Sequence, residues 1–366
     1  MKFSTSRESL LKPLQVVIGV VERRQTMPVL ANVLLVAKDG ELTVTATDLE
    51  VELSSTNPID TVTAPGDITV PGRKLLDICR ALEDGPDVKV SLKGDRVTVQ
   101  SGRSRFVLST LPAAEFPLIE DAAMDREFTM SQASLSHLLD RTHFSMAQQD
   151  VRYYLNGLLL ETGGGKLRAV ATDGHRLALS DTPLDGDGSA KNQVIVPRKG
   201  VLELQRLLEG DDEVQIALSD NHIRVVVGGI RFTSKLIDGR FPDYDRVIPD
   251  NEAYVLKADR DLLRHALQRA AILSNEKYRG VRLEFMAGKI KIQANNPDQE
   301  EAEEEVEVDY DGMDMEIGFN VNYLVDALNA VENSEVELGL VDPGSSCVVR
   351  APGDKDSLYV VMPMRL

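Results

Sequence analysis

Two periodicities of apolar residues alternate along the chain and predict helices and strands in a fixed order. Near the N-terminus, Leu10, Leu14 and Val17 stand three or four residues apart, which predicts an amphipathic helix with Ser6 as its N-cap. Short apolar segments follow, beginning with Val33–Val36, and Asp39-Gly40 predicts a hairpin turn between two of them. The first third of the chain therefore combines helices with antiparallel strands.

A change of apolar phase interrupts this strand region. Apolar residues occupy even positions up to Ala46 and odd positions from Leu49 onward. Because the side chains of a strand alternate between its two faces, such a change requires a bulge or a turn. We therefore interpret Thr47-Asp48 as the break between two strands.

The same succession of elements returns twice. Ala46-Thr47-Asp48 recurs as Ala171-Thr172-Asp173, and Phe116-Pro117 recurs as Phe241-Pro242, both 125 residues later. A third, degenerate copy has Ala294 in the place of Ala171. Repeats of this length are domains rather than solenoid units. The pattern predicts an α+β fold of three similar domains, each with two helices and an antiparallel sheet, at residues 1–122, 123–250 and 251–366.

Charge is distributed unevenly between the predicted helices and the rest of the chain. The formal net charge is −18, which by itself argues against a protein that binds nucleic acid through basic residues. The predicted helical stretches nevertheless carry 18 basic and 13 acidic residues. These stretches are residues 7–24, 72–83, 132–152, 197–209, 259–282 and 320–332. Two interpretations remain open: Lys and Arg are good helix formers, or the helices line a surface that faces phosphate.

Cysteine is scarce, with Cys79 and Cys347 as the only two. Two thiols make neither a disulfide framework nor a cysteine-rich metal site, and the chain has no EF-hand spacing. The N-terminus lacks an apolar signal-peptide core, and no apolar run is long enough to span a membrane. We expect a soluble, cytoplasmic protein without a metal or a cofactor.

Asp173 and His175 are the first candidates for catalysis, because they place an acid and a base two residues apart. No nucleophile motif, phosphate-binding loop or zinc-protease motif accompanies them. Gly163-Gly164-Gly165 predicts a hairpin turn rather than a phosphate loop, because no helix start with Lys and Ser or Thr follows it.

Seven stretches spread over the whole chain carry a family resemblance. They are Arg23–Leu30, Thr47–Glu50, Gln149–Gly157, Ala171–Leu177, Phe241–Tyr244, Ser274–Gly280 and Met362–Leu366. In this order they resemble the bacterial DNA sliding clamp, the beta subunit of DNA polymerase III. The resemblance implies a head-to-tail homodimer whose six domains form a ring around duplex DNA. It also implies a processivity factor that has no catalytic activity and binds DNA without sequence specificity.

In the middle domain, the resemblance implies a hydrophobic pocket that binds peptides of partner proteins. Leu, Val, Pro and Met supply an apolar surface, and methionine adapts to several partners. The implied pocket residues are Leu155, Thr172, Gly174, His175, Arg176, Leu177, Pro242, Arg246, Val247, Asn320, Tyr323, Ser346, Val360, Met362, Pro363, Met364 and Arg365. From the residues alone, Met362–Leu366 is either a frayed tail or a docked one. Gly344 departs from the family pattern, since related clamps can carry a larger apolar residue at this rim.

A second set of residues is implied to face DNA. It consists of Arg24, Arg73, Gln149, Arg152, Tyr153, Tyr154, Lys199, Arg240 and Arg279. Basic side chains on helix ends and loops are otherwise simply solvated. Tyr153 and Tyr154 either stack on an unpaired strand or belong to the core.

The glutamates around position 303 have three interpretations: a solvated acidic face, a metal site, which lacks the EF-hand pattern, or an interface. Basic residues in the first domain and acidic residues in the last favour head-to-tail pairing of two chains. The family places an interface there. Its implied residues are Lys74, Arg96, Arg103, Arg105, Phe106, Leu108, Ile272, Leu273, Glu300, Glu301, Glu303 and Glu304, and Glu305 extends the acidic run.

The implied partners are double-stranded DNA, the DNA polymerase III catalytic subunit, the clamp loader, and other polymerases and repair proteins that carry a clamp-binding peptide. A second copy of the chain completes the ring, and no membrane is involved. Two rivals remain: an enzyme that uses Asp173 and His175, and a protein-interaction scaffold that forms no ring.

Overall fold

The computed structural model describes residues 1–366 except 22–26, 120–122, 185–190 and 366. The described residues divide into two units. Unit 1 contains residues 1–135 and 199–236, and unit 2 contains residues 136–198 and 237–366. Because the chain crosses from one unit to the other within its middle third, that third contributes strands to both.

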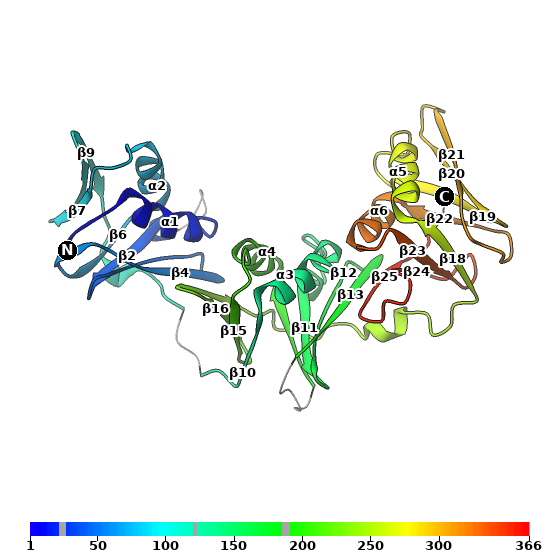
Figure 1. Cartoon of the computed structure of the whole chain (residues 1–366), viewed down its shortest axis with the longest axis horizontal. Helices are drawn as coiled ribbons and strands as arrows, with labels where there is room; N and C mark the ends of the chain where they lie inside the picture. The colour runs from blue at the N-terminus through cyan, green and yellow to red at the C-terminus, as the bar shows by residue number, and fades with distance from the viewer. Residues whose placement is uncertain (22–26, 120–122, 185–190, 366) are drawn as a thin grey trace. The chain divides into compact units, whose positions relative to one another are not determined.

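Unit 1 contains two antiparallel sheets (Figure 1). The five-stranded sheet has the order β5 (Thr61–Ala64), β1 (Lys2–Thr5), β7 (Val88–Lys93), β8 (Arg96–Ser101) and β9 (Ser104–Ser109). The eight-stranded sheet has the order β10 (Arg126–Ser131), β15 (Glu213–Leu218), β16 (His222–Val227), β17 (Ile230–Lys235), β4 (Val51–Pro58), β3 (Glu41–Thr47), β2 (Asn32–Lys38) and β6 (Gly66–Pro71). Helices α1 (Arg7–Val17) and α2 (Gly72–Ala81) pack together beside these sheets.

Unit 2 repeats this construction. Its eight-stranded sheet has the order β14 (Asn192–Pro197), β11 (Gly157–Gly163), β12 (Lys166–Thr172), β13 (Arg176–Pro183), β25 (Ser357–Val361), β24 (Cys347–Arg350), β23 (Glu335–Leu340) and β18 (Tyr254–Asp259). Its four-stranded sheet has the order β21 (Glu301–Glu307), β20 (Lys289–Asn295), β19 (Gly280–Met286) and β22 (Met315–Asn320). Helices α5 (Arg260–Ala271) and α6 (Val321–Ala330) pack together. The two remaining helices, α3 (Gln132–Asp140) and α4 (Arg198–Leu207), each contain the boundary between the units.

Each eight-stranded sheet joins two copies of the repeat through one antiparallel strand pair, which we call a seam. The first seam is β4 with β17, where Leu53 lies opposite Phe232. The second seam is β13 with β25, where Ala178 lies opposite Tyr359. β9 and β21 occupy the corresponding places in their own copies, and both are edge strands of the described sheets.

The repeat, the strand break and the turns predicted from the sequence are confirmed. The described residues contain two helices in each third of the chain, and Ser6 caps α1 by accepting a hydrogen bond from the Ser9 N–H at 3.1 Å. β3 ends at Thr47 and β4 begins at Val51, which places the break where the apolar phase changes. The hairpin turn at 163–165 joins β11 to β12, and its glycines have positive φ.

Several predicted helices are shorter than expected. The stretch 132–152 is α-helical only to Asp140, and the stretch 259–282 only from Arg260 to Ala271. After α3, the Thr142 hydroxyl donates to the Leu138 carbonyl at 2.7 Å, and this side-chain bond competes with continuation of the helix.

Candidate functional site

The turn between β12 and β13 is held by its own side chains. One carboxylate oxygen of Asp173 accepts the N–H groups of His175 and Arg176 at 2.9 and 3.1 Å. The Thr172 hydroxyl donates to the Arg176 carbonyl at 2.6 Å and accepts the Gly174 N–H at 3.1 Å. Asp173 therefore stabilises the turn by capping backbone N–H groups, a common role of Asp side chains in turns.

The equivalent turn between β3 and β4 has the same hydrogen bonds, but its backbone conformation is less favourable. Asp48 accepts the N–H groups of Glu50 and Val51 at 2.9 and 2.7 Å. Leu49 sits at φ +79°, a region unfavourable for a side chain, where the second turn has Gly174 at φ +88°. The second turn is therefore the relaxed copy, and it presents His175 to solvent.

Arg176 ties this turn to the C-terminal third of unit 2. Its guanidinium donates to Asp173 at 3.1 Å, to Asp326 of α6 at 2.5 Å and to the Phe144 carbonyl at 2.7 Å. It also lies 4.5 Å from the ring centroid of Tyr323. Since each of its three nitrogens donates a hydrogen bond, Arg176 is held between the turn, α6 and the Phe144 carbonyl.

The apolar members of the predicted pocket set meet at the second seam. Leu177 lies opposite Val360 across β13 and β25, and both belong to one buried cluster. Leu155, on the 3₁₀ turn Tyr153–Leu155, is also buried. We call these three buried side chains the apolar floor of the candidate site.

The C-terminal residues border this floor. The Met362 N–H donates to the His175 carbonyl at 2.9 Å, and the Met364 N–H donates to the Gly318 carbonyl at 2.8 Å. Met362, Pro363 and Met364 are partly exposed, and Arg365 is exposed. Of the two interpretations of this tail, the docked one holds for residues 362–364, while Arg365 is exposed and Leu366 lies outside the described residues.

The segment after Phe241 forms the opposite border. Phe241 and Tyr244 are buried in the same cluster as Leu177 and Val360, and Val247 packs against that cluster. Pro242 and Arg246 are exposed. The 3₁₀ turn Tyr244–Val247 thus has one side on the seam and the other in solvent.

The remaining members of the predicted pocket set lie at its periphery. Asn320 caps α6 by accepting the Asn322 N–H at 2.9 Å. Gly344 is exposed and donates its N–H to Asp342 at 2.7 Å, so a polar turn stands at this place. Ser346 is partly exposed. The predicted pocket residues are therefore all in unit 2, and its floor and both borders are contiguous through the second seam.

The described residues predicted to face DNA belong to both units, with Arg73 and Lys199 in unit 1 and the others in unit 2. Arg73 donates to the Val21 carbonyl at 2.6 Å, and Lys199 is ion-paired with Asp48 across the first seam. Arg152 donates to Asp150 at 2.8 Å and to the Asp173 carbonyl at 3.1 Å.

The Arg152 bonds lower the pKa of Asp150 to about 2, through the side-chain bond first and the Arg152 backbone N–H second. Tyr153 is exposed, whereas Tyr154 packs against the buried cluster under the pocket, which favours the core interpretation for Tyr154. Gln149 and Arg240 are exposed, and Arg279 is partly exposed. Arg24 lies outside the described residues.

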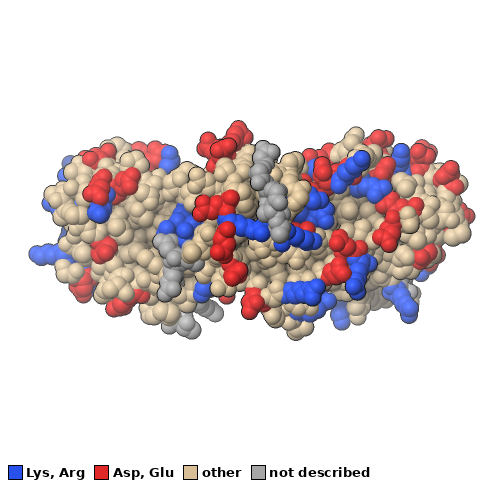
Figure 2. Space-filling model, turned by 90° about the horizontal axis from the view of Figure 1, so that it is seen from below, with Lys and Arg blue, Asp and Glu red and all other residues tan. Residues whose placement is uncertain are grey.

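The basic bias of the helices is present in the observed elements. The six helices of the described residues contain 11 Lys or Arg and 6 Asp or Glu, although the whole chain has a net charge of −18. On the face drawn in Figure 2, basic and acidic side chains are intermixed and no large patch of one sign stands out. The surplus of positive charge is thus a property of the helices rather than of that face.

The predicted dimer-interface residues concentrate on the two edge strands and the end of α5. β9 contains Arg105, Phe106 and Leu108, and Arg103 precedes it. Ile272, directly after α5, exposes 74% of its surface although it is apolar. Lys74 and Arg96 are exposed as well.

Several glutamates in or next to β21 already have partners within their own chain. Arg269 donates to both carboxylate oxygens of Glu304, at 2.8 and 2.7 Å. Lys291 pairs with Glu303 at 2.9 Å, and Asn296 donates to Glu300 at 2.6 Å. Glu301 is exposed, and Leu273 is partly exposed.

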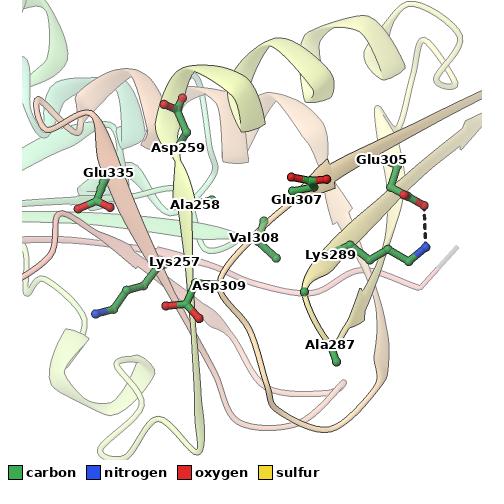
Figure 3. Close-up of a pocket in the computed structure, with 11 residues that line it drawn as sticks. Lys257, Ala258, Asp259, Ala287, Lys289, Glu305, Glu307, Val308, Asp309 and Glu335 are labelled. Carbon is green, nitrogen blue, oxygen red and sulfur yellow. Dashed lines mark hydrogen bonds and ion pairs between the residues drawn. The ribbon is translucent and has the colours of Figure 1, made fainter.

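A cavity of about 670 Å³ lies elsewhere in unit 2, between β18 and the start of β20 (Figure 3). Two of its charged side chains have roles in the fold: Lys289 pairs with Glu305 at 2.9 Å, and Asp259 accepts the Leu262 N–H at 2.8 Å. The cavity is a polar surface hollow, and none of the predicted pocket residues lines it.

Within the described part of the chain, no group of three or more His, Cys, Asp or Glu side chains has a metal-binding arrangement. In the same residues, no helix combines the length and apolarity needed to cross a membrane.

Comparison with known proteins matches this architecture along the full chain. Family models of the DNA polymerase III beta subunit match with the N-terminal domain at residues 1–120, the central domain at 129–243 and the C-terminal domain at 245–365. The beta sliding clamps of Pseudomonas aeruginosa and Escherichia coli K12 are 55% and 53% identical, with 100% of both chains covered in each case.

Solved structures agree with the sequence comparison. A crystal structure of the DNA polymerase sliding clamp from P. aeruginosa with ligand has a TM-score of 0.98 at 54% identity, over 100% of both chains. Another, bound to griselimycin, has a TM-score of 0.97 at 55% identity, again over 100% of both chains. The sliding clamp from Caulobacter crescentus gives 0.94 at 42% identity over the same full coverage.

Three similar α+β domains joined in this way define a DNA clamp fold. The chain belongs to the family of DNA polymerase III beta subunits, the beta sliding clamps. It is a processivity factor of DNA replication and a non-catalytic subunit. The enzyme alternative is wrong, and the geometry gives a reason: the Asp173 carboxylate is occupied by the backbone of its own turn and by Arg176.

Proposed function

We propose that two copies of this chain pair head to tail and close a ring around duplex DNA. The observation that carries the proposal is that equivalent strands are paired in two places and left unpaired in a third. β4 pairs with β17 and β13 with β25, whereas β9 and β21 are left as sheet edges in the described structure. An unpaired edge is a template for another strand. β9 of one protomer and β21 of the next therefore supply a third seam, and two such seams close a cyclic dimer.

Charge and apolar surface at these edges support the same pairing. Arg103 and Arg105 lie on or next to β9, and the glutamates lie on β21, so the two edges attract each other. Phe106, Leu108, Ile272 and Leu273 supply apolar contacts, with Lys74 and Arg96 at the rim. Because Glu303 and Glu304 also have cations of their own chain, the apolar contacts carry most of the affinity.

The DNA side of the proposal rests on the helices. Their surplus of Lys and Arg favours a surface that meets phosphate, and phosphate contacts position DNA without reading its sequence. Arg73, Gln149, Arg152, Tyr153, Lys199, Arg240 and Arg279 are the described residues that we assign to this surface or its loops. Lys199 and Arg152 contribute less than free cations, since each already has a carboxylate partner.

The partner side rests on the second seam. Leu177, Val360 and Leu155 form a floor on which a short apolar peptide binds, between the 362–365 tail and the 242–247 segment. Two or three buried apolar anchors contribute roughly 1.5–3 kcal/mol each, and after the cost of ordering the peptide this gives about micromolar affinity. Such binding allows exchange among partners.

These partners are the DNA polymerase III catalytic subunit, the clamp loader, and other polymerases and repair proteins with a clamp-binding peptide. The protein acts in the cytoplasm at the nucleoid, and its domains are residues 1–122, 123–250 and 251–366.

Retention on DNA of different topology tests the ring. The protein is loaded onto a nicked circular plasmid by its clamp loader, and half of the sample is then linearised. We expect the protein to stay on the circle and to leave the linear molecule by sliding off its ends. Equal release from both forms would overturn the ring and would favour the scaffold alternative, for which gel filtration would also show a monomer.

A further inference from the structure

The segments that follow Phe116-Pro117 and Phe241-Pro242 are equivalent in the repeat but are fastened to their sheets differently. In unit 1, the Ile119 N–H donates to a carboxylate oxygen of Glu52 at 2.8 Å. Glu52 lies on β4 at the first seam and is 2% exposed. The segment after Phe116 is therefore bonded directly to a seam strand.

Glu52 occupies the place that the second seam gives to an apolar residue. Glu52 lies opposite Thr233 on β17, and in the second seam Leu177 lies opposite Val360 on β25. The two pairs are equivalent, because each lies one residue away from a hairpin pair that is itself equivalent in the two copies of the repeat. The floor of the proposed peptide site thus corresponds to a place that the first seam fills with a carboxylate and a bound backbone N–H.

In unit 2, the segment after Phe241 is held by hydrogen bonds to strands that lie further from the seam. Tyr244, the counterpart of Ile119, donates its hydroxyl to Glu161 of β11 at 3.2 Å. The same Glu161 oxygen accepts Gln193 at 2.6 Å and Lys191 at 2.8 Å. Arg168 of β12 donates to the Tyr244 hydroxyl at 3.4 Å.

Arg168 is itself fixed by Asp181 of β13, with bonds of 2.6 and 2.8 Å to its two carboxylate oxygens. Burial raises the pKa of Glu161, but the hydrogen bonds from Lys191 and Gln193 outweigh it and leave the pKa below its ordinary value. Tyr244 is 4% exposed, and its ring belongs to the cluster that contains Leu177 and Val360. The hydroxyl thus meets a charged, largely enclosed acceptor, the kind of bond that is strong and sensitive to position.

We propose that Glu161, Arg168 and Tyr244 are positioning residues of the peptide site. They hold the 242–247 segment beside Leu177 and Val360 rather than across them, so the second seam keeps an apolar floor that the first seam lacks. This inference rests on the proposed peptide site. It also explains why a chain with two equivalent seams offers a partner site at only one of them.

Two conservative substitutions test the network while the apolar floor is kept. Tyr244→Phe removes only the hydroxyl, and Glu161→Gln keeps the size of the side chain but removes its charge. We expect each to weaken binding of the DNA polymerase III catalytic subunit about 5- to 20-fold in surface plasmon resonance. Because both act through one bond network, the double variant should lose little more than either single one.

Matched controls separate positioning from a general loss of structure. Tyr310→Phe removes a hydroxyl that donates to the Met313 carbonyl at 2.7 Å elsewhere in unit 2, and Glu52→Gln alters the equivalent fastening in the first seam. Both controls should bind the catalytic subunit as the wild type does, and all four variants should remain dimeric. Wild-type affinity in Tyr244→Phe and Glu161→Gln would overturn the inference, and so would an equal loss in the two controls.

A fifth variant distinguishes this inference from the peptide site on which it rests. Val360→Asp places a charge on the floor itself. If Val360→Asp binds normally, the peptide site is wrong. If Val360→Asp loses binding while Tyr244→Phe and Glu161→Gln keep it, the site stands and only the positioning role is wrong.

Discussion

The backbone N–H of Met362 donates a hydrogen bond to the carbonyl oxygen of His175, with 2.9 Å between nitrogen and oxygen. The first seam has the same bond, from the Lys235 N–H to the Glu50 carbonyl at 2.8 Å. The C-terminal tail therefore continues the ladder of a seam beyond the last strand residue. What differs is the side chains: the first seam ends in Lys and Glu, and the second in Met and His.

Deleting residues 362–366 should weaken partner binding and leave the dimer intact. Val360 and its strand pairing remain, so unit 2 keeps its core, but two methionines at the border of the floor are lost. We expect at least a tenfold loss of affinity for the DNA polymerase III catalytic subunit, equivalent to about 1.4 kcal/mol. Surface plasmon resonance measures the affinity, and sedimentation measures the dimer. Lys355→Ala, on an exposed loop before β25, is the control, and unchanged affinity after the deletion would remove the tail from the site.

Substituting Arg176 by Lys should destabilise unit 2 even though the charge is kept. A lysine ammonium cannot bond Asp173, Asp326 and the Phe144 carbonyl together or stack on Tyr323 as the planar guanidinium does. We expect a loss of about 2 kcal/mol in the free energy of unfolding, measured by urea denaturation. Arg246→Lys is the matched control, because Arg246 is highly exposed and pairs with nearby Asp243 at the surface. Equal stability of the two variants would show that Arg176 is not a structural tie.

The repeat and the helix pairs were predictable because their signal is local. Leu10, Leu14 and Val17 are all buried, and the phase change at Thr47-Asp48 is the observed break. β21 was missed as a strand because Glu has a low preference for strands and only Ala302 and Val306 in it are apolar and shielded. It forms beside β20, where Lys289 pairs with Glu305 and Lys291 with Glu303, while Arg269 of α5 pairs with Glu304.

The candidate site was only partly predictable, for a similar reason. The family resemblance named the residues that line it, but not what holds them. Arg176 and Asp326 are 150 positions apart, and no local pattern connects them. Glu161 and Arg168 have the sequence appearance of exposed strand residues, and their roles depend on Tyr244, which the fold brings to them from a distant segment.

His222 should make the stability of unit 1 fall in mildly acidic solution. Among the described residues, both of its ring nitrogens are buried without a hydrogen-bond partner. Burial first, and then Lys235 and Arg224, lower the pKa of His222 below its ordinary value. The neutral ring is favoured in the folded state, so this contribution is complete above about pH 6.5 and is lost as the pH falls from there towards the folded-state pKa.

A comparison of wild type and His222→Gln at pH 7.5 and pH 5.5 checks this contribution. The variant should lose less stability than the wild type between these two values, as measured by thermal unfolding. His265→Gln, on the exposed face of α5, should keep the wild-type dependence. The same loss of stability in wild type and in His222→Gln would exclude His222 as the cause.

The register of the proposed third seam follows from the two that are observed. Phe106 is equivalent to Phe232 and Tyr359. Each of the three lies opposite a valine in its hairpin, namely Val99, Val225 and Val349 in that order. Ala302 is equivalent to Leu53 and Ala178. In their hairpins these three residues lie opposite Ala294, Ala46 and Ala171, which are equivalent in the repeat. Phe106 of one protomer should therefore lie opposite Ala302 of the next, as Phe232 lies opposite Leu53.

A pair of cysteines at these two positions tests that register. Residues directly opposite on antiparallel strands have Cα atoms about 4.5–5.5 Å apart, within the range that a disulfide spans. We expect Phe106→Cys with Ala302→Cys to form a covalent dimer on mild oxidation, and the native Cys79 and Cys347 are buried and should not interfere. Val107→Cys with Ala302→Cys is the control, since a shift of one residue turns the side chain to the other face. Crosslinking of the control pair with the same yield would contradict the register and with it the equivalence of the third seam.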